Sequence, residues 1–291
     1  MDKRAIQKEK QRARYYRSAR SLVRVALKEY NQQFIEDLKK CQTPAQMKAL
    51  AEKPLRSAEI EKALLKIWVP VSRQFGTETF NSLMPVSKSL KFEPNIGGLV
   101  RPTDLAGNAR SVIGLQGSID AAAAVNEDFW LTWANKMLKG TLGERIKLIT
   151  GTTRDVFIKA VDRIAYAGFE AGKGVPEIAK EIMKDLNITE RYRAERIART
   201  EVISASNSSS QAGAQATGLE LDKEWISYID ENTRDSHRDL NGAKVDINEQ
   251  FSNGLDVPGD PSGEADEVIN CRCTVGYGSK EGSGFNWGRD I

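Results

Sequence analysis

The side chains in this sequence that are best suited to bind a metal or transfer a proton lie near its C-terminus. The chain has one histidine, His237, and two of its three cysteines, Cys271 and Cys273, stand in the same region. Thiolates and imidazoles are zinc ligands, and histidine also acts as a general base. The pattern therefore raises two kinds of chemistry: metal binding, and acid–base or nucleophilic catalysis.

The two cysteines occur in a segment, residues 268–277, whose alternation is typical of a half-buried strand. Ile269, Cys271 and Cys273 fall on one face of such a strand, because successive side chains point to opposite faces. Free cysteine is among the most often buried residue types and packs as a small hydrophobe. The pattern favours two packed thiols in the core of a small C-terminal unit.

A zinc site is the alternative that these residues leave open. Structural zinc takes four ligands, and His237 with the two cysteines supplies only three. An aspartate such as Asp230 or Asp235 would complete the set, but no spacing requires it. We therefore expect no bound metal and no other cofactor.

His237 is expected to fix a turn by hydrogen bonding, because neutral imidazole offers one donor and one acceptor. The enzymatic alternative is a metal-dependent hydrolase, similar to a nuclease, that uses His237 with nearby carboxylates and Cys271. The sequence shows no glycine-rich phosphate loop, no HExxH motif and no nucleophile elbow. These absences favour a protein that is not an enzyme.

The order of segments predicts a mainly α-helical protein with a small α+β unit at the C-terminus. Residues 1–91 have helical periodicity and a basic composition, whereas residues 92–118 have the glycine and proline content of a loop or linker. Helices are expected to resume at residue 119 and to continue to about residue 217. Period-two segments then predict a β unit over residues 222–277, with a polar tail at residues 278–291.

Local signals predict several element boundaries. Thr43 and Pro44 provide a cap and a first-turn proline for one helix, and Pro70 ends or kinks the next. Thr189 opens a long helix, and residues 224–229 form a strand. The second half of the long helix carries mostly small side chains, so we expect a neighbouring backbone to approach it closely. Its charged residues are expected to tie it to the C-terminal unit.

The two ends of the chain have opposite charge. Residues 1–40 carry twelve lysines and arginines against five acids, and residues 221–291 carry seven against fifteen. Such asymmetry predicts different partners for the two ends, although a charged run is often only a solvated face. The candidate contacts with DNA or with an acidic protein surface are Lys8, Arg12, Arg14, Arg17, Arg20 and Arg24.

No apolar run approaches the roughly 20 residues that span a bilayer, and the basic N-terminus lacks the apolar segment of a secretory signal. The sparse cysteines are typical of a reducing compartment. We expect a protein made in the cytoplasm, without a membrane partner.

Several motifs together resemble the phage Mu F-like family of head morphogenesis or minor head proteins. They are Arg199-Thr200-Glu201, Trp225 with the pattern from Asp230 through Arg234 and His237 to Gly242, Pro258-Gly-Asp-Pro261, and Asn270-Cys-Arg-Cys-Thr274. The domain implied is residues 119–277. Some members carry cysteines at the positions of Arg234 and His237 and a histidine at Val268, in the pattern of a zinc site. This chain departs from that pattern, which favours the packed interpretation.

The resemblance implies a non-enzymatic virion component in the interior of a phage head, made in the host cytoplasm. It would associate with the portal protein and act in head morphogenesis and in genome packaging or delivery. Genomic DNA and other head proteins are further implied partners. The motif and core residues that it marks are Arg199, Thr200, Glu201, Trp225, Asp230, Arg234, His237, Gly242, Cys271 and Cys273.

Overall fold

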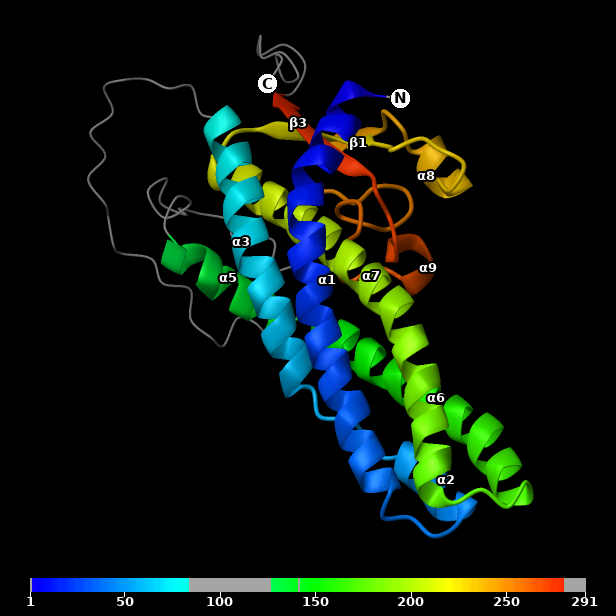
Figure 1. Cartoon of the computed structure of the whole chain (residues 1–291). Coiled ribbons are helices and arrows are strands. Elements are labelled where there is room, and N and C mark those ends of the chain that lie inside the picture. Colours follow the sequence, from blue (N-terminus) through cyan, green and yellow to red (C-terminus); the bar gives the residue numbers. More distant parts are fainter. Residues whose placement is uncertain (1, 84–126, 141, 280–291) are drawn as a thin grey trace. The chain divides into compact units, whose positions relative to one another are not determined.

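The computed structural model describes residues 2–83, 127–140 and 142–279 (Figure 1). These residues are mainly helical, with a three-stranded antiparallel sheet near the C-terminus, which confirms the predicted fold class. The expected linker, residues 92–118, lies outside the described residues, as does the polar tail beyond residue 279. None of the described helices is long and apolar enough to cross a membrane.

The chain folds into two compact units that interleave along the sequence. The first comprises Met1–Tyr16, Ile67–Leu142 and Thr200–Ile291, and the second comprises Arg17–Lys66 and Gly143–Arg199. The residues with candidate chemistry, near the C-terminus, all belong to the first unit.

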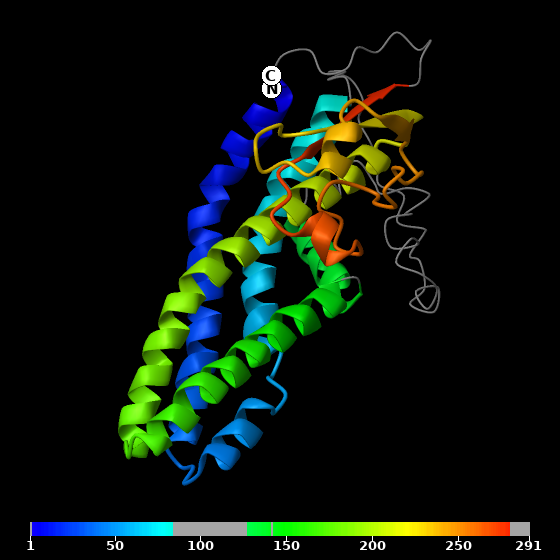
Figure 2. The ribbon, with the colours of Figure 1, turned by 90° about the vertical axis from the view of Figure 1, so that its right-hand side faces the viewer.

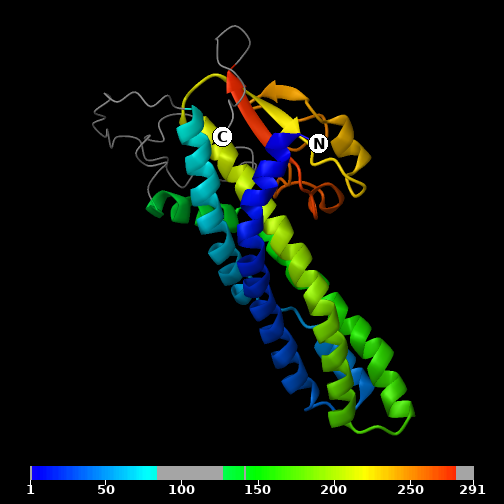
Figure 3. The same ribbon diagram turned by 45° about the horizontal axis from the view of Figure 1, so that its top comes forward.

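Long helices supply most of the first unit. It takes the first part of α1 (Lys3–Leu38), the second part of α3 (Ala58–Leu83) and the second part of α7 (Val175–Ala216), together with α5 (Glu127–Lys139). Helices α1 and α3 lie side by side there (Figures 1 and 3), and the rings of Tyr15 and Phe75 pack with centroids 6.3 Å apart.

The second unit contains α2 (Pro44–Ala51) and α6 (Leu142–Glu170) beside the remaining parts of the long helices. Thr43 caps α2, as predicted, by accepting a hydrogen bond from the Gln46 N–H at 3.2 Å. Figure 2 shows α6 turning into α7 over residues 171–174. Gly172 makes this turn possible, because its φ of +74° lies in the left-handed region that glycine adopts without steric cost.

Helix α7 differs from its predicted course. The predicted helix start at Thr189 is wrong, because α7 continues through this residue and the Thr189 hydroxyl donates to the Asp185 carbonyl of the preceding turn at 3.2 Å. Threonine can bond either a free helix end or a carbonyl within a helix. Pro70 does not end α3, which continues to Leu83, so of the two predicted effects of this proline only a kink remains.

The small residues of α7 do allow a close helix crossing. A Cβ built on Gly213 would lie 2.2 Å from the Gly76 carbonyl oxygen of α3, and one built on Gly76 would lie 2.0 Å from the Trp130 ring of α5. Both distances are far inside van der Waals contact. The two glycines therefore let α3, α5 and α7 pack at a spacing that no larger residue permits.

The C-terminal part of the first unit is built on a sheet of order β2-β1-β3. Strand β1 (Leu221–Ile226) pairs with β2 (Lys244–Asp246) on one side and with β3 (Thr274–Ser279) on the other. Two short helices, α8 (Asp235–Asp239) and α9 (Ala265–Val268), lie in the long connections between the strands. Much of this part therefore has no regular ladder and depends on side-chain contacts.

The predicted strands are displaced from the observed ones. Strand β1 begins and ends three residues before the predicted 224–229, and β3 begins only at Thr274. Cys271 and Cys273 therefore precede the strand instead of lying on it. Asn270 explains this, because its φ of +58° turns the chain after α9 and interrupts the extended alternation.

The close helix crossing gives a direct test. Gly213→Ala should lower the free energy of unfolding by roughly 1–3 kcal/mol, since the added methyl meets backbone that cannot rotate away. Gly151→Ala in α6 is the matched control, because nothing lies within 4 Å of its added Cβ. The control should be neutral or stabilising by up to about 1 kcal/mol. Urea unfolding of both variants would contradict this packing if their effects were equal.

Candidate functional site

The motif from Asp230 to His237 forms a turn that leads into α8. Asp230 accepts the Asn232 N–H at 2.9 Å and the Thr233 hydroxyl at 3.1 Å, and the Thr233 N–H donates to the Asp230 carbonyl. Such side-chain bonds to nearby backbone are what favour aspartate and threonine in turns. The turn and the short helix place His237 in the interior of the C-terminal part, with 1% of its surface exposed.

His237 meets two thiols on one side and a carboxylate on the other. Its Nδ1 lies 3.7 Å from Cys271 Sγ and 3.6 Å from Cys273 Sγ, and its Nε2 lies 3.0 Å from Glu267 Oε2. The Trp225 ring packs edge-on against the imidazole, with centroids 5.0 Å apart. The structure thus brings together the three residues that the sequence singled out, and it adds Glu267.

Glu267 is held in a fixed orientation by two further hydrogen bonds. Ser236 Oγ donates to Oε1 at 2.9 Å, and Asn253 Nδ2 donates to Oε2 at 3.2 Å. Burial opposes ionisation of this carboxyl, but the bonds from Ser236 and Asn253 and the approach of His237 outweigh it and hold the pKa of Glu267 below its usual value. The carboxylate therefore fixes the direction of the imidazole ring.

The two thiols are sealed from solvent. Cys271 and Cys273 are each 2% exposed and belong to an apolar cluster with Trp225, Phe251 and Leu255 among its members. The predicted burial is confirmed. A hydrogen bond between the thiols raises the pKa of Cys271, and the same bond lowers the pKa of Cys273. A buried thiolate is a metal ligand or a packed group, but it cannot attack a substrate that does not reach it.

Asp230, Arg234 and Gly242 have structural partners. Asp230 forms an ion pair with Arg272 at 2.5 Å, and Arg234 donates to the Ile269 carbonyl at 2.6 Å. Gly242 adopts φ +84°, which lets its N–H reach the Trp225 carbonyl at 2.8 Å. The Asp230 and Arg234 contacts connect the α8 turn to the segment that carries the cysteines, and the Gly242 bond connects it to β1.

The Arg199-Thr200-Glu201 triplet sends its side chains in different directions. Thr200 accepts the Asn270 N–H at 3.1 Å, so the threonine ties α7 to the cysteine segment. Glu201 is buried and accepts the Trp68 indole N–H at 3.0 Å. Arg199 pairs with Glu195 one turn away on α7, in the second unit. The uncharged member of the triplet therefore contributes a tie between α7 and the C-terminal part.

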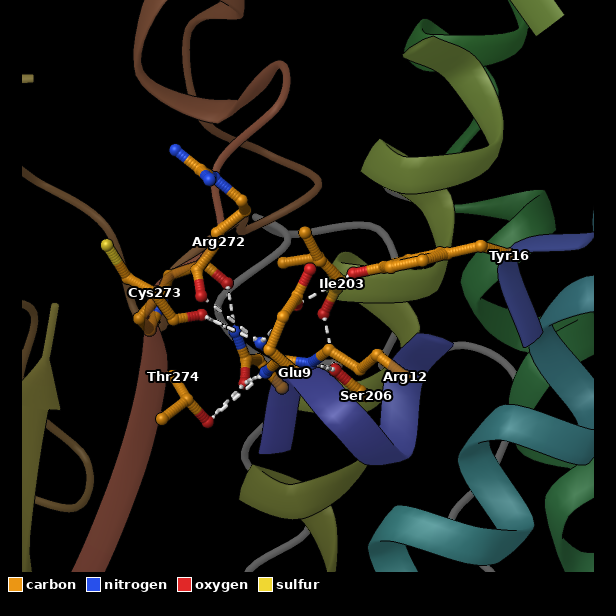
Figure 4. A network of polar contacts seen from close by, with 10 residues as sticks. Glu9, Arg12, Tyr16, Ile203, Ser206, Arg272, Cys273 and Thr274 are labelled. Carbon is orange, nitrogen blue, oxygen red and sulfur yellow. Dashed lines mark hydrogen bonds and ion pairs between the residues drawn. The ribbon is translucent and has the colours of Figure 1, made fainter. Parts of the chain in front are cut away.

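One arginine of the basic N-terminal region is completely buried. Arg12 Nε donates to Ser206 Oγ at 2.7 Å, and its Nη2 donates to Asn207 at 2.6 Å and to Thr274 Oγ1 at 3.1 Å (Figure 4). Its Nη1 donates to the Cys273 carbonyl at 3.2 Å. The guanidinium joins α1, α7 and the start of β3, so Arg12 cannot serve as the surface contact that the sequence suggested.

The other basic candidates either form ion pairs within the protein or are exposed to solvent. Lys8 lies 3.4 Å from Glu78, and burial lowers its pKa. Arg24 pairs with the buried Glu190 at 3.1 Å. The exposed residues of the set are Arg14, Arg17 and Arg20, of which Arg20 pairs with Glu195 at 2.9 Å.

Lys223 is a buried cation that the sequence did not reveal. Its side chain lies on the inward face of β1 with Leu221 and Trp225, and its ammonium is 5.5 Å from the centre of the Phe251 ring. Nζ has no hydrogen-bond partner among the described residues. Burial lowers the pKa of Lys223 to about 8 despite nearby carboxylates. The predicted strand began one residue later, at residue 224, and so excluded it.

Glu267, Asn253 and Ser236 also escaped the sequence analysis. Each is a common surface residue type, and Glu267 stands in an acidic run. Only the folded chain shows that Glu267 meets His237 and that Ser236 and Asn253 both bond to Glu267.

Comparison with known proteins confirms the resemblance. Residues 159–276 match the family described as Phage Mu protein F like protein. The chain is 32% identical over 156 residues to an NAD(+)–arginine ADP-ribosyltransferase of Enterococcus faecalis, covering 52% of this chain and 31% of that protein. It is 28% identical over 128 residues to the minor head protein GP7 of Bacillus phage SPP1, covering 41% of each. The chain thus spans less than half of either relative. No solved structure gives a significant match.

The Arg12 network predicts a large stability effect from one buried side chain. Arg12→Met should lower the free energy of unfolding by roughly 3 kcal/mol, since Ser206, Asn207 and Thr274 each lose a charged, buried donor. Arg14→Met, two residues away and exposed, should change it by no more than about 0.5 kcal/mol. Equal unfolding curves for the two variants would contradict the network.

Lys223 predicts a pH dependence. The pKa of Lys223 is lower in the folded chain, so the unfolded chain binds more protons between about pH 8 and pH 10.5, and this residue makes stability rise over that range. Lys223→Met should raise the free energy of unfolding at pH 7 by roughly 1–3 kcal/mol, and the gain should shrink towards pH 10.5. Lys244→Met, exposed on β2, is the control. Denaturant unfolding across this range would refute the prediction if the Lys223→Met gain were absent or constant.

Proposed function

We propose that this chain is a minor head protein of a tailed phage, because residues 159–276 match the phage Mu F-like family. In this role it takes part in head morphogenesis as a structural component of the virion. The match to a relative named minor head protein supports the proposal.

The finer part of the proposal concerns place and partners. We assign the chain to the interior of the head, next to the portal protein, where it acts in genome packaging or delivery. The basic N-terminal region and the acidic C-terminal region support this, since they suit partners of opposite charge. Contact with genomic DNA falls to the exposed arginines of α1, because Arg12 is used internally.

An enzymatic role is the second candidate, because one relative is named as an ADP-ribosyltransferase. The matched segment is 31% of that protein, which leaves most of it without a counterpart here. The residues with candidate chemistry in this chain, His237 and the two cysteines, are buried at 1–2% exposure. A substrate cannot reach these buried side chains, so the site supports neither transferase nor hydrolase chemistry.

The enzymatic candidate is tested directly. The purified full chain, incubated with NAD⁺ and an arginine-containing acceptor, should transfer no ADP-ribose, and it should not cleave DNA in the presence of divalent metals. A known arginine transferase and a known nuclease in parallel reactions show that each assay works. Reproducible transfer or cleavage that follows the protein through purification would refute the structural assignment.

DNA contact is tested by neutralising exposed charge. A triple variant with Arg14, Arg17 and Arg20 replaced by glutamine should bind double-stranded DNA more weakly at low salt. The slope of log affinity against log salt should decrease by roughly three, because about three fewer counterions are released. The matched control replaces three exposed lysines, Lys62, Lys66 and Lys180, in the same way.

The same variants test portal association by co-purification with the portal protein. Weaker DNA binding in the arginine variant alone, with portal binding retained in both, is the expected result. If the two variants lose DNA affinity equally, the arginines of α1 have no special role. If the wild-type chain does not co-purify with the portal, the proposed location is wrong.

A further inference from the structure

Two sulfur atoms and one ring nitrogen converge on a single point in the C-terminal part of the first unit. His237 Nδ1, Cys271 Sγ and Cys273 Sγ all lie within 4.8 Å of one another, and all three residues are buried. We propose that they bind one zinc ion. The sequence alone favoured packed thiols, and the geometry points to the alternative that it left open.

The distances fit zinc coordination. Zinc lies about 2.3 Å from a cysteine sulfur and about 2.0–2.1 Å from a histidine nitrogen, with tetrahedral angles. These values place a sulfur and a nitrogen ligand about 3.6 Å apart. The observed Nδ1–Sγ distances are 3.7 Å for Cys271 and 3.6 Å for Cys273. Both nitrogen–sulfur distances are therefore those of a zinc site, and no two of the three ligand atoms are more than 4.8 Å apart.

Hydrogen bonding alone does not require the two sulfurs to lie equally close to Nδ1. Neutral histidine has one N–H and one lone pair. Nε2 faces the Glu267 carboxylate at 3.0 Å and so carries the proton, which leaves a single lone pair on Nδ1. That lone pair accepts one thiol proton, and the other thiol bonds to the first sulfur, so a purely hydrogen-bonded cluster would not need both sulfurs at nearly equal distance from Nδ1. A metal ion at their common focus satisfies all three atoms at once.

Glu267 has the position of the outer partner that zinc-binding histidines require. Such a histidine donates its second N–H to a carboxylate or carbonyl, which fixes the ring and strengthens the metal bond. Glu267 does this here, and it is oriented in turn by Ser236 and Asn253. A histidine that served only as packing would not need a carboxylate held by two further side chains.

The donor set selects the metal. Thiolate and imidazole favour zinc over magnesium or calcium, which take oxygen ligands. Asp230 is not the fourth ligand, because its carboxylate is paired with Arg272 at 2.5 Å. We assign the fourth position to a water molecule, which zinc commonly keeps when the protein supplies three ligands.

The zinc ion would act as a crosslink. It joins α8 to the segment before β3, where the chain has no strand pairing. The ends of the long irregular connection would then be fixed by coordination as well as by packing, so metal binding would contribute directly to folding.

The test uses the full chain, purified without chelators from zinc-supplemented cells. Elemental analysis should find one zinc per chain. Removing the zinc and adding cobalt(II) should give a sulfur-to-cobalt charge-transfer band in the near ultraviolet. These measurements on the wild type do not depend on whether any variant folds.

Variants locate the site. Cys271→Ser and Cys273→Ser should lose the cobalt band, whereas Cys41→Ser, at the partly exposed third cysteine, should keep it. Glu267→Gln should retain one zinc but bind it about 10–100-fold more weakly, measured against a chelating indicator. A folded wild-type chain that takes up neither zinc nor cobalt overturns the proposal. So does a cobalt band that persists in both serine variants.

Discussion

The buried guanidinium of Arg12 is the interaction on which the first unit depends. A buried cation is tolerated only when its donors are satisfied, and Arg12 finds partners on α7 and on the segment that enters β3. Ser206 and Asn207 are themselves in the small-residue half of α7, where the backbones of α3 and α7 meet at Gly76 and Gly213. The first turns of α1 are therefore part of the core as well as part of a basic arm.

This constraint also explains how the cysteine segment is held. Between α9 and β3 the chain has no ladder partner, yet it is fixed from two sides. The Cys273 carbonyl accepts hydrogen bonds from Arg12 and from Asn207, and the Asn270 N–H donates to Thr200. On the other side the thiols face His237. The backbone contacts thus orient the sulfur atoms towards one point before any ligand is considered.

The buried cluster and the charged surface have separate places in the fold. The histidine and thiols are enclosed by Trp225, Phe251 and other apolar side chains, so they contact one another and are not accessible from solvent. The charges available to a partner include the exposed ones on α1 and on the acidic C-terminal part. Binding would therefore occur through surfaces, with the buried cluster maintaining the fold that presents them.

Much of this could be predicted from the sequence, where neighbouring residues decide the outcome. Helical periodicity, the Thr43 cap and the small residues of α7 act over one or two turns, so they indicated the helices and the close approach of a neighbour. The motif residues indicated the family and brought His237 and the cysteines together as candidates. The helix start predicted at Thr189 and the strand predicted at 268–277 were wrong. In both places the local sequence is compatible with two backbone structures, and contacts with distant residues decide which one forms.

Only the tertiary structure decided the roles of Arg12, Lys223 and Glu267. In the sequence, Arg12 is one of several similar basic residues, and its buried partners lie 194 or more residues away. Glu267 stands in an acidic run 30 residues from the histidine that it orients. The sequence fixes the type and charge of each residue, but the burial of a side chain and its distance from a partner are set only when the chain folds. Because the energy of a charged group depends on burial and distance, its function was settled only by the fold.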